Sequence, residues 1–367
     1  MIKINKPTIL IAPLDWGLGH ATRCIPIIKT LKNADYDIVV AVNEKQQALL
    51  SKEFCDIKFI RLAGYDINYA KNSWLFKATI FFQIPKMLSS IKRENKWLKE
   101  IIDKEKIDLV ISDNRFGLYS KKIPCVFITH QLTIKAPFKW LENILQKINY
   151  SYINRYTQCW IPDIGNENNI AGILSHPAKM PTIPTNYLGV LSRFTKPYFS
   201  ENKYDICVVL SGPEPQRTTL ENILLKQLST LTKMKILFVR GLPQTIEKLK
   251  VGTIQIENHL QQVELQAAIC SSEIIVARSG YTTIMELLSL QKKTILIATP
   301  GQTEQEYLAT HLYEQKKCLS FSQSKINIET AMTIATKFDY VITTEFIFNE
   351  SKMLTLMKGL LSKFPAK

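Results

Sequence analysis

The amino-acid sequence predicts an α/β protein with two Rossmann-like domains. The chain has 367 residues, more than a single hydrophobic core usually organises. Short β-branched runs alternate with helical patterns, which is typical of parallel sheets covered by helices on both faces. The alternation occurs in two series, with a proline-rich passage between them. We therefore expect two parallel sheets facing each other across a cleft.

The elements follow in order along the chain. The first series predicts strands at 8–12, 38–42, 58–61, 109–112 and 126–129. The second predicts strands at 205–210, 236–239, 253–256, 274–277 and 294–298, and helices after Asn327. The passage 162–198 contains several prolines and suits a connector. We expect domains at 1–200 and 201–367, with the C-terminal helix as a candidate to pack back on the first domain.

Composition narrows the class of protein. Hydrophobic residues make up 46% of the chain and charged residues 22%, which is typical of a globular protein. Seven cysteines are scattered without a Cys-x-x-Cys pair, and this favours a reducing cytoplasm. No apolar run is long enough for a spanning helix, and no secretory signal opens the chain, so we expect a protein that starts at Met1 and remains cytoplasmic.

The formal net charge of +15 fits a nucleic-acid binder, a protein that contacts anionic lipid, or an enzyme for phosphorylated substrates. Lysines are spread along the whole chain, without the arginine-rich and aromatic signatures of RNA or DNA modules. The sequence therefore disfavours nucleic acid as a partner.

A glycine turn follows the first predicted strand. The segment from Ala12 to Arg23 contains Gly17-Leu-Gly19-His20 and leads into a helix that we expect to run to about Leu31. Glycines permit a tight turn, and the positive end of a helix helps to keep an imidazole neutral. His20 is thus a candidate general base for a hydroxyl proton. The alternative is a histidine that merely caps its turn.

Asp113 ends another strand of the first series, in Ile107-Asp-Leu-Val-Ile-Ser-Asp113. Strands of a parallel sheet present their carboxyl ends at one edge, so this carboxylate can hold His20 in one tautomer and stabilise its imidazolium. The alternative is an ordinary loop or cap aspartate.

In the second series, Ser211-Gly212 follows a strand and Arg217 stands near the start of the next helix. Amides of such a turn can meet an anion, and Arg217 adds a positive partner. The alternative for Arg217 is a surface arginine at a helix start.

The most specific segment runs from Ile274 through Arg278-Ser279-Gly280-Tyr-Thr282-Thr-Ile-Met-Glu286. Amides at its Ser-Gly turn can cradle a diphosphate, and the carboxylate two helical turns further on suits a ribose diol. Gln305 and Glu306 begin a later helix and can bind sugar hydroxyls. The alternative for this last pair is an acidic first turn.

These motifs resemble glycosyltransferase family 28 of the GT-B superfamily, in its MurG-like branch. The resemblance covers both halves of the chain. It implies an inverting, metal-independent transfer from a nucleoside diphosphate sugar. The expected donor is a UDP-sugar, and no cofactor is expected. The acceptor is a hydroxyl group whose carrier the sequence leaves open; a lipid-linked or cell-envelope glycan is one candidate.

The resemblance also implies roles for single residues. It places Gly17 and Gly19 in the acceptor or phosphate loop. Glu286 is expected to bind the ribose, and Gln305 is expected to bind the donor sugar. The residues expected to bind the phosphates are Ser279, Gly280 and Thr282, and Arg278 lies in the same donor motif. Leu260 offers backbone groups to the base. The Ser211-Gly212 turn resembles a second phosphate loop, although Pro213 and Pro215 replace its usual flexible residues.

Two other functions share this fold. A nucleotide-sugar 2-epimerase would need additional acid–base carboxylates, and a non-catalytic subunit would have lost His20 or Glu286. No metal site is expected: Asp35-Tyr36-Asp37 precedes a strand, at the edge opposite the ligands. The remaining histidines lack metal-ligand spacing with cysteine.

The segment 71–106 carries nine Lys/Arg against four Asp/Glu, interleaved with aromatic residues such as Trp74, Phe81 and Trp97. This pattern resembles an interfacial segment that contacts an anionic membrane at its inner face. The interpretation we favour is a pair of amphipathic helices that pack on the sheet with a basic solvent face, and membrane contact is the alternative.

Overall fold

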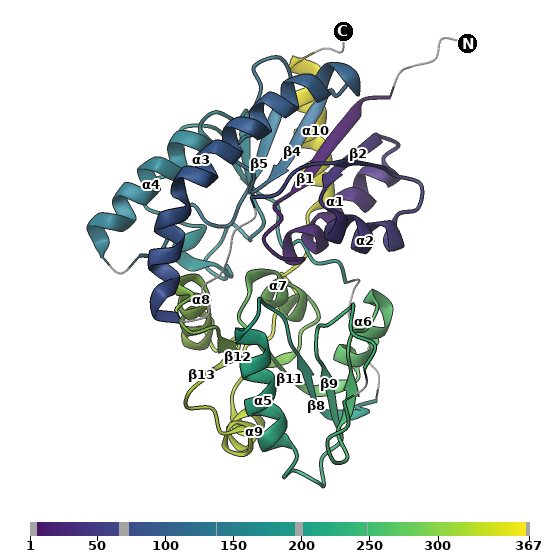
Figure 1. Cartoon of the computed structure of the whole chain (residues 1–367), viewed down its shortest axis with the longest axis vertical. Helices are drawn as coiled ribbons and strands as arrows, with labels where there is room; N and C mark the ends of the chain where they lie inside the picture. The colour runs from purple at the N-terminus through teal and green to yellow at the C-terminus, as the bar shows by residue number, and fades with distance from the viewer. Residues whose placement is uncertain (1–5, 66–72, 137, 195–200, 248, 365–367) are drawn as a thin grey trace. The chain divides into compact units, whose positions relative to one another are not determined.

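A computed structural model of the chain describes residues 6–65, 73–136, 138–194, 201–247 and 249–364, with 73–84 described by their backbone. The described chain forms two compact units. The first contains 6–65, 78–136, 138–193 and 347–364, and the second contains 73–77, 194, 201–247 and 249–346 (Figure 1).

In the described residues, the first unit holds a seven-stranded parallel sheet in the order β3-β2-β1-β4-β5-β6-β7. Its strands are β1 (Thr8–Pro13), β2 (Asp37–Val42), β3 (Lys58–Arg61), β4 (Leu109–Asp113), β5 (Cys125–Ile128), β6 (Gln158–Ile161) and β7 (Thr185–Tyr187). Its helices are α1 (Gly19–Asn33), α2 (Glu44–Glu53), α3 (Ser73–Lys104), α4 (Lys139–Ile153), the 3-10 turn η1 (Gly172–Leu174) and α10 (Glu350–Lys363). The chain order reverses between the adjacent strands β1 and β4, which makes this pair the switch point of the sheet.

The second unit holds a six-stranded parallel sheet in its described residues, in the order β10-β9-β8-β11-β12-β13. Its strands are β8 (Tyr204–Val209), β9 (Ile236–Val239), β10 (Gln255–Glu257), β11 (Ser272–Arg278), β12 (Lys293–Ala298) and β13 (Leu319–Ser322). Its helices are α5 (Gln216–Leu228), α6 (Gln262–Cys270), α7 (Tyr281–Ser289), α8 (Thr303–Glu314) and α9 (Ile328–Lys337). The switch point lies between β8 and β11.

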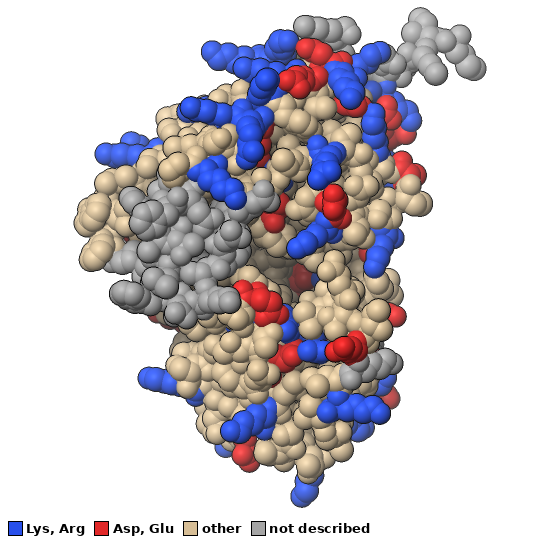
Figure 2. Space-filling model, in the orientation of Figure 1, with Lys and Arg blue, Asp and Glu red and all other residues tan. Residues whose placement is uncertain are grey.

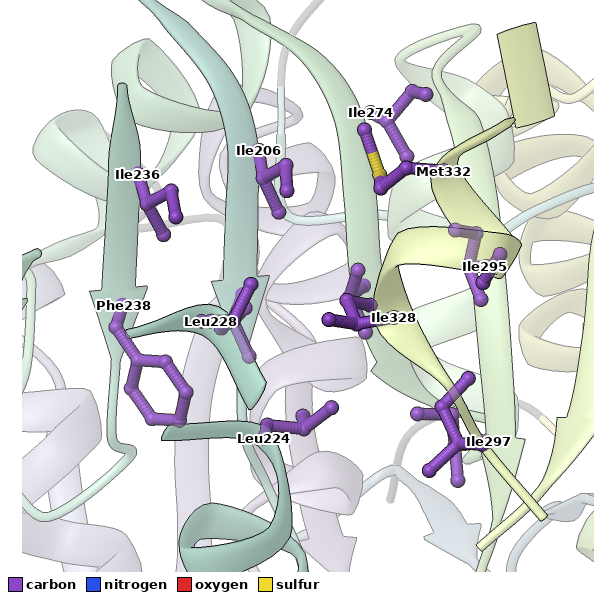
Figure 3. Close-up of a cluster of buried hydrophobic side chains, with 14 of the residues drawn as sticks. Ile206, Leu224, Leu228, Ile236, Phe238, Ile274, Ile295, Ile297, Ile328 and Met332 are labelled. Atoms are coloured by element: carbon purple, nitrogen blue, oxygen red, sulfur yellow. The ribbon is translucent and has the colours of Figure 1, made fainter. Parts of the chain in front are cut away.

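The core of the second unit explains why its strands are apolar on both sides. One face of the sheet packs against α5 and α9, in a cluster that includes Ile206, Leu224, Phe238, Ile274 and Met332 (Figure 3). The opposite face packs against α6 and α7 in a cluster of its own. Burial on both faces is the reason that these strands read as continuous hydrophobic runs.

The predicted class of two Rossmann-like α/β domains with parallel sheets is confirmed, and each expected strand matches an observed one to within two residues at either end. Three strands were missed: β6, β7 and β13. The passage 162–198 is therefore not only a connector, since β7 forms within it and pairs with β6 at the edge of the first sheet. All three strands have only three or four residues and give a weak alternation pattern, and β7 and β13 are in addition half-exposed edge strands. At the other end of the chain, α10 belongs to the first unit and contacts α1.

Candidate active site

The switch point of the first sheet brings two sequence-predicted residues together. Pro13 at the end of β1 pairs with Asp113 at the end of β4. The turn 14–18 then leads from β1 into α1, whose second residue is His20. The side chains of His20 and Asp113 meet, with 2.9 Å between Nδ1 and Oδ2.

The chemistry of Asp113 fixes the tautomer of His20. The carboxyl is fully buried; burial by itself would raise its pKa, but Arg23 and His20 outweigh this effect and lower the pKa to about 2. An ionised carboxylate only accepts hydrogen bonds, so Nδ1 of His20 must donate. Burial, followed by the charge of Arg23, lowers the pKa of the imidazole. His20 is therefore neutral near pH 7, with an unprotonated Nε2, and its side chain keeps 15% exposure.

Arg23 is a member of this cluster that the sequence analysis did not identify. Its Nε donates to both carboxylate oxygens of Asp113, at 3.0 and 2.9 Å, and its Nη2 also bonds Oδ1. Its Nη1 lies 3.4 Å from Nδ1 of His130, which follows β5. Residues three apart share one face of a helix, so the i,i+3 spacing of His20 and Arg23 was the available signal.

The turn 14–18, which contains Gly17 and leads into Gly19, is anchored through Asp15 to a buried ionic cluster. The carboxylate of Asp15 accepts from the backbone N–H of Tyr65 at 3.1 Å and lies 3.6 Å from the guanidinium of Arg115. Arg115 also bonds Glu94 at 2.6 Å. Gly17 has φ +79°, a left-handed conformation that favours glycine, and Gly19 is the first residue of α1. The turn is thus fixed by its own neighbours.

In the second unit, the carboxyl ends of β8 and β11 lie side by side, and each opens into a predicted loop. Ser211 and Gly212 follow β8, and Ser279 and Gly280 follow β11. Leu260 lies after β10 and packs against the core. The structure therefore brings the loops of the two switch-point strands together, with Leu260 at the far end of the same sheet edge.

Gly280 stands immediately before α7 in an unstrained conformation, with φ −72°. A Cβ placed on it would meet no protein atom within 4 Å. Neither backbone strain nor packing requires glycine here, so the space above its backbone is open to a ligand. Thr282 lies in the first turn of α7, and Glu286 lies on the same helix with its side chain mostly buried. A helix N-terminus with open backbone amides suits a phosphate.

The loop after β12 is tied to this turn. The hydroxyl of Ser279 donates to the backbone carbonyl of Gln305 at 2.9 Å. The side chain of Gln305 accepts from the N–H of Thr299 and donates to Gln302, while Glu306 accepts from the N–H of Gly301. Gln305 and Glu306 lie in the first turn of α8, and their side chains hold the loop 299–302 in place.

Arg278 lies inside the unit, where it is 1% exposed. Its guanidinium donates to the backbone carbonyls of Gln216 and Ala298, at 2.7 and 3.1 Å, and to the side chain of Gln323 at 2.6 Å. Burial lowers its pKa to about 10. This arginine joins the start of α5 to the end of β12, so it supports the donor loops from within.

Arg217 also has internal partners. Its guanidinium pairs with Glu214 at 2.5 Å and with Glu221 at 2.6 Å, and Glu221 pairs in turn with Arg240. The side chain is buried rather than exposed at a helix start. The geometry favours a structural network around the N-terminus of α5 over a phosphate contact by this residue.

Asp37 begins β2 at the amino edge of the sheet, opposite to His20. Asp35 pairs with Lys6 at 2.5 Å. Across the described part of the chain, no group of three or more His, Cys, Asp or Glu side chains is placed to hold a metal ion.

The segment 71–106 falls mostly within the single helix α3, where the sequence favoured a pair of helices. The side chains of Trp74, Phe76, Phe81, Phe82 and Ile84 lie outside the described residues. Further along, Leu98 and Ile102 are buried and Trp97 packs against the core of the first unit. This half of α3 is an amphipathic helix on the sheet. No helix in the described ranges has the length and apolar character needed to cross a membrane.

Two family models match the chain. The model of the glycosyltransferase family 28 C-terminal domain matches residues 218–337, and the model of glycosyl transferase family 1 matches residues 9–162. A relative from Clostridium tetani, a UDP-N-acetylglucosamine–N-acetylmuramyl-(pentapeptide) pyrophosphoryl-undecaprenol N-acetylglucosamine transferase, is 25% identical over 76% of this chain and 74% of that protein.

Solved structures share the fold at low sequence identity. MurG of Acinetobacter baumannii aligns with a TM-score of 0.55 and 13% identity, covering 98% of this chain and all of that one. A putative UDP-N-acetylglucosamine 2-epimerase of Listeria monocytogenes aligns with a TM-score of 0.62 and 10% identity, covering 99% of both chains. The fold alone is thus common to transferases and to a putative epimerase.

Proposed function

Because the chain belongs to glycosyltransferase family 28 of the GT-B superfamily, and is a glycosyltransferase, we propose that it transfers a sugar from a UDP-sugar to a hydroxyl of a lipid-linked acceptor. The proposal includes inversion at the anomeric carbon and no requirement for a metal ion.

The hydrogen bond between His20 and Asp113 carries this proposal. The neutral imidazole takes the proton from the acceptor hydroxyl at Nε2 while the hydroxyl oxygen attacks the anomeric carbon. The bond from that carbon to the diphosphate breaks, and UDP departs with the electron pair. Asp113 stabilises the imidazolium formed in this step. One direct displacement inverts the anomeric configuration.

The second unit supplies the donor site. Amides at the N-terminus of α7, next to Gly280, bind the diphosphate together with Thr282, while the buried Ser279 holds the turn through its hydrogen bond to Gln305. The positive end of the helix dipole compensates the charge that develops on the leaving group, which is the part a metal ion plays elsewhere. The Ser211-Gly212 turn stands beside this site at the neighbouring strand end.

The remaining contacts follow the resemblance to family 28. Glu286 binds the ribose, Leu260 offers backbone groups to the base, and Gln305 with Glu306 approaches the donor sugar. Arg278 and Arg217 hold these loops through internal hydrogen bonds and are not assigned to the donor itself.

Support for a lipid-linked acceptor comes from the Clostridium tetani relative, whose name includes pyrophosphoryl-undecaprenol. Such an acceptor places the enzyme at the inner face of a membrane as a peripheral protein. The basic net charge of +15 is compatible with that location. On the face shown in Figure 2, basic side chains are scattered and interspersed with acidic ones, rather than gathered into the stripe of a nucleic-acid binder.

A thermal-shift screen of nucleoside diphosphates and their sugars tests the proposal. A ligand that binds only the native state stabilises it by about 2.7 kcal/mol at a hundred times its Kd. We expect UDP and one UDP-sugar to raise the Tm, with no added effect of Mg²⁺. A selective response to a purine nucleotide, or a response that requires metal, would contradict the assignment of the donor.

A further inference from the structure

A chain of polar contacts crosses the carboxyl ends of three neighbouring strands in the second unit. It begins at Glu221, a buried residue of α5, the helix that follows β8. The Oε2 atom of Glu221 accepts from Nη1 of Arg217 at 2.6 Å and from Nε of Arg240 at 3.0 Å. Its Oε1 accepts from Nη2 of Arg240 at 2.8 Å. One carboxylate thus holds two guanidinium groups.

Arg240 connects this carboxylate to the neighbouring strand. It follows β9 directly, and its side chain is 14% exposed. Its Nη1 donates to Oδ1 of Asn258, the residue after β10, at 2.9 Å. Burial by itself would raise the pKa of Glu221, but hydrogen bonds from Arg240 and Arg217 outweigh this effect and lower the pKa. The ionised carboxylate therefore fixes the guanidinium of Arg240, which in turn holds Asn258.

Asn258 ties the segment after β10 to the loop after β9. Its Nδ2 donates to the backbone carbonyls of Thr245 and Glu247, both at 2.9 Å, so both hydrogens of the amide are used. Its own backbone carbonyl accepts from the N–H of Leu242 at 2.7 Å. The side chain of Asn258 is thus engaged inside the unit, where it holds the backbone of two segments together.

Leu260 lies between two anchored neighbours. Asn258 is held by the contacts above, and the N–H of Gln261 donates to Glu264 at 3.0 Å in a capping box at the start of α6. The side chain of Leu260 packs against the core. Among the residues that the structure describes, however, the backbone N–H and C=O of Leu260 take part in no hydrogen bond. They offer one donor and one acceptor on a segment that is fixed at both ends.

A backbone donor and acceptor on one residue can read the edge of a nucleobase. Uracil presents an N3–H donor next to its O4 acceptor, whereas cytosine presents an N3 acceptor next to its amino donor. The two bases therefore need the protein donor and acceptor in opposite positions. A backbone held in one position satisfies only one of them, and a site built for that hydrogen bonding rejects the other base.

We propose that Glu221, Arg240 and Asn258 are positioning residues that set the base selectivity of the donor site by holding the backbone of Leu260 in place. They act through that backbone and are not assigned to the donor itself. The inference rests on the proposed function, in which Leu260 faces the base, and it adds the residues that make this contact selective.

Isothermal titration of the full-length protein with UDP, CDP, ADP and GDP tests the proposal. Asn258→Ala removes the contacts to Arg240 and to the loop after β9. Arg240→Lys keeps a positive charge beside Glu221 but cannot form the forked contact. Two different variants are used because they disturb the same chain of contacts at different points.

The matched control is Gln227→Ala. Gln227 also fixes a segment of the second unit through its side-chain amide, which bonds the carbonyl of Ile326 and the N–H of Ile328, at 2.9 and 2.8 Å. It lies near the C-terminal end of α5, away from the carboxyl ends of the strands. A thermal melt of each variant checks that the protein is folded and measures its loss of stability.

We expect the wild type and Gln227→Ala to prefer UDP over CDP by at least about tenfold. In Asn258→Ala and Arg240→Lys this preference should fall by at least about fivefold, because UDP is bound more weakly. A preference that stays unchanged in either of these two variants would overturn the proposal, since the contacts would then serve stability alone. An equal fall in Gln227→Ala would overturn it as well, because any loosening of the unit would then have the same effect.

The base that the wild type prefers separates this inference from the proposed function. A preference for UDP that either variant retains rejects the inference alone. Should the wild type prefer CDP, ADP or GDP, the UDP-sugar donor is rejected, and the inference stands only if both variants lose that preference. A wild type that prefers none of the four nucleotides would overturn both.

Discussion

Asp113 accepts hydrogen bonds from both His20 and Arg23, and the two donors approach the same carboxylate from one face of α1. The imidazole nitrogen lies 2.9 Å from Oδ2. The carboxylate therefore orients the proposed base, while the guanidinium of Arg23 partly neutralises the negative charge of the carboxylate. Because a carboxylate raises the pKa of a nearby imidazole and a guanidinium lowers it, the two partners set the basicity of His20 in opposite directions.

Arg23→Gln should move the acidic limb of the pH profile of kcat/KM upward. The unprotonated form of His20 is the active one, so the rate falls as the pH drops through the pKa of the imidazole, which lies below 6.5 in the wild type. Without the positive charge of Arg23, that pKa rises. Asp113→Asn removes a negative charge and should move the limb downward instead. Shifts in the same direction for both variants would contradict the assigned electrostatics.

Gly280→Ala should weaken UDP binding while leaving the fold nearly as stable. The added Cβ meets no protein atom, so we expect a loss in stability of about 1 kcal/mol, the difference between glycine and alanine at an N-cap position. The same Cβ occupies space that we assign to the diphosphate. Isothermal titration with UDP and a thermal melt measure the two effects. Gly359→Ala is the control, since its Cβ also enters open space but in α10 of the other unit; unchanged UDP affinity in Gly280→Ala would refute the phosphate assignment.

Glu286→Ala should weaken binding of UDP by about 1–3 kcal/mol, the worth of a hydrogen bond to a charged group. Binding of 2′-deoxy-UDP should change less, because that ligand lacks one of the hydroxyls in question. Glu314→Ala, an exposed position at the end of α8, is the control and should alter neither ligand. Equal losses for the ribose and deoxyribose forms would remove Glu286 from the ribose site.

Arg115→Met should lower the free energy of unfolding by about 3–5 kcal/mol, since it breaks a buried ion pair and leaves Glu94 without its cation. The double variant Arg115→Met/Glu94→Gln should recover part of this loss. Urea unfolding of the two single variants and the double variant gives the coupling energy. If the two single effects simply add, Arg115 and Glu94 are not energetically coupled, and the ionic cluster that includes Asp15 does not act as a unit.

Much of this architecture could be predicted from the sequence, because β-branched runs and glycine turns are local signals. The positions of His20 and Asp113 followed from strand ends, and parallel strands that meet at a switch point bring their carboxyl ends together. The direction of long side chains was not predictable in this way. Arg217 and Arg278 stand beside loops in the sequence, yet their guanidinium groups turn inward to carboxylates and backbone carbonyls.

Helix α4 was not predicted. It packs Tyr150 and Ile153 into the core of the first unit, and it also buries Glu142 and Asn149, which tertiary hydrogen bonds hold in place. Sequence patterning assumes that the buried side of a helix is apolar. Buried polar residues with tertiary partners interrupt that pattern.

The turnover of His20→Ala tests the central claim most directly. We predict that sugar transfer falls by about 10²–10⁴, the usual effect of removing a positioned general base, and that the acidic limb of the pH profile disappears. The affinity for UDP, which we assign to the second unit, should remain within error of the wild type. Transfer at a near wild-type rate, with the acidic limb intact, would contradict the account and leave His20 as a residue that only caps its turn.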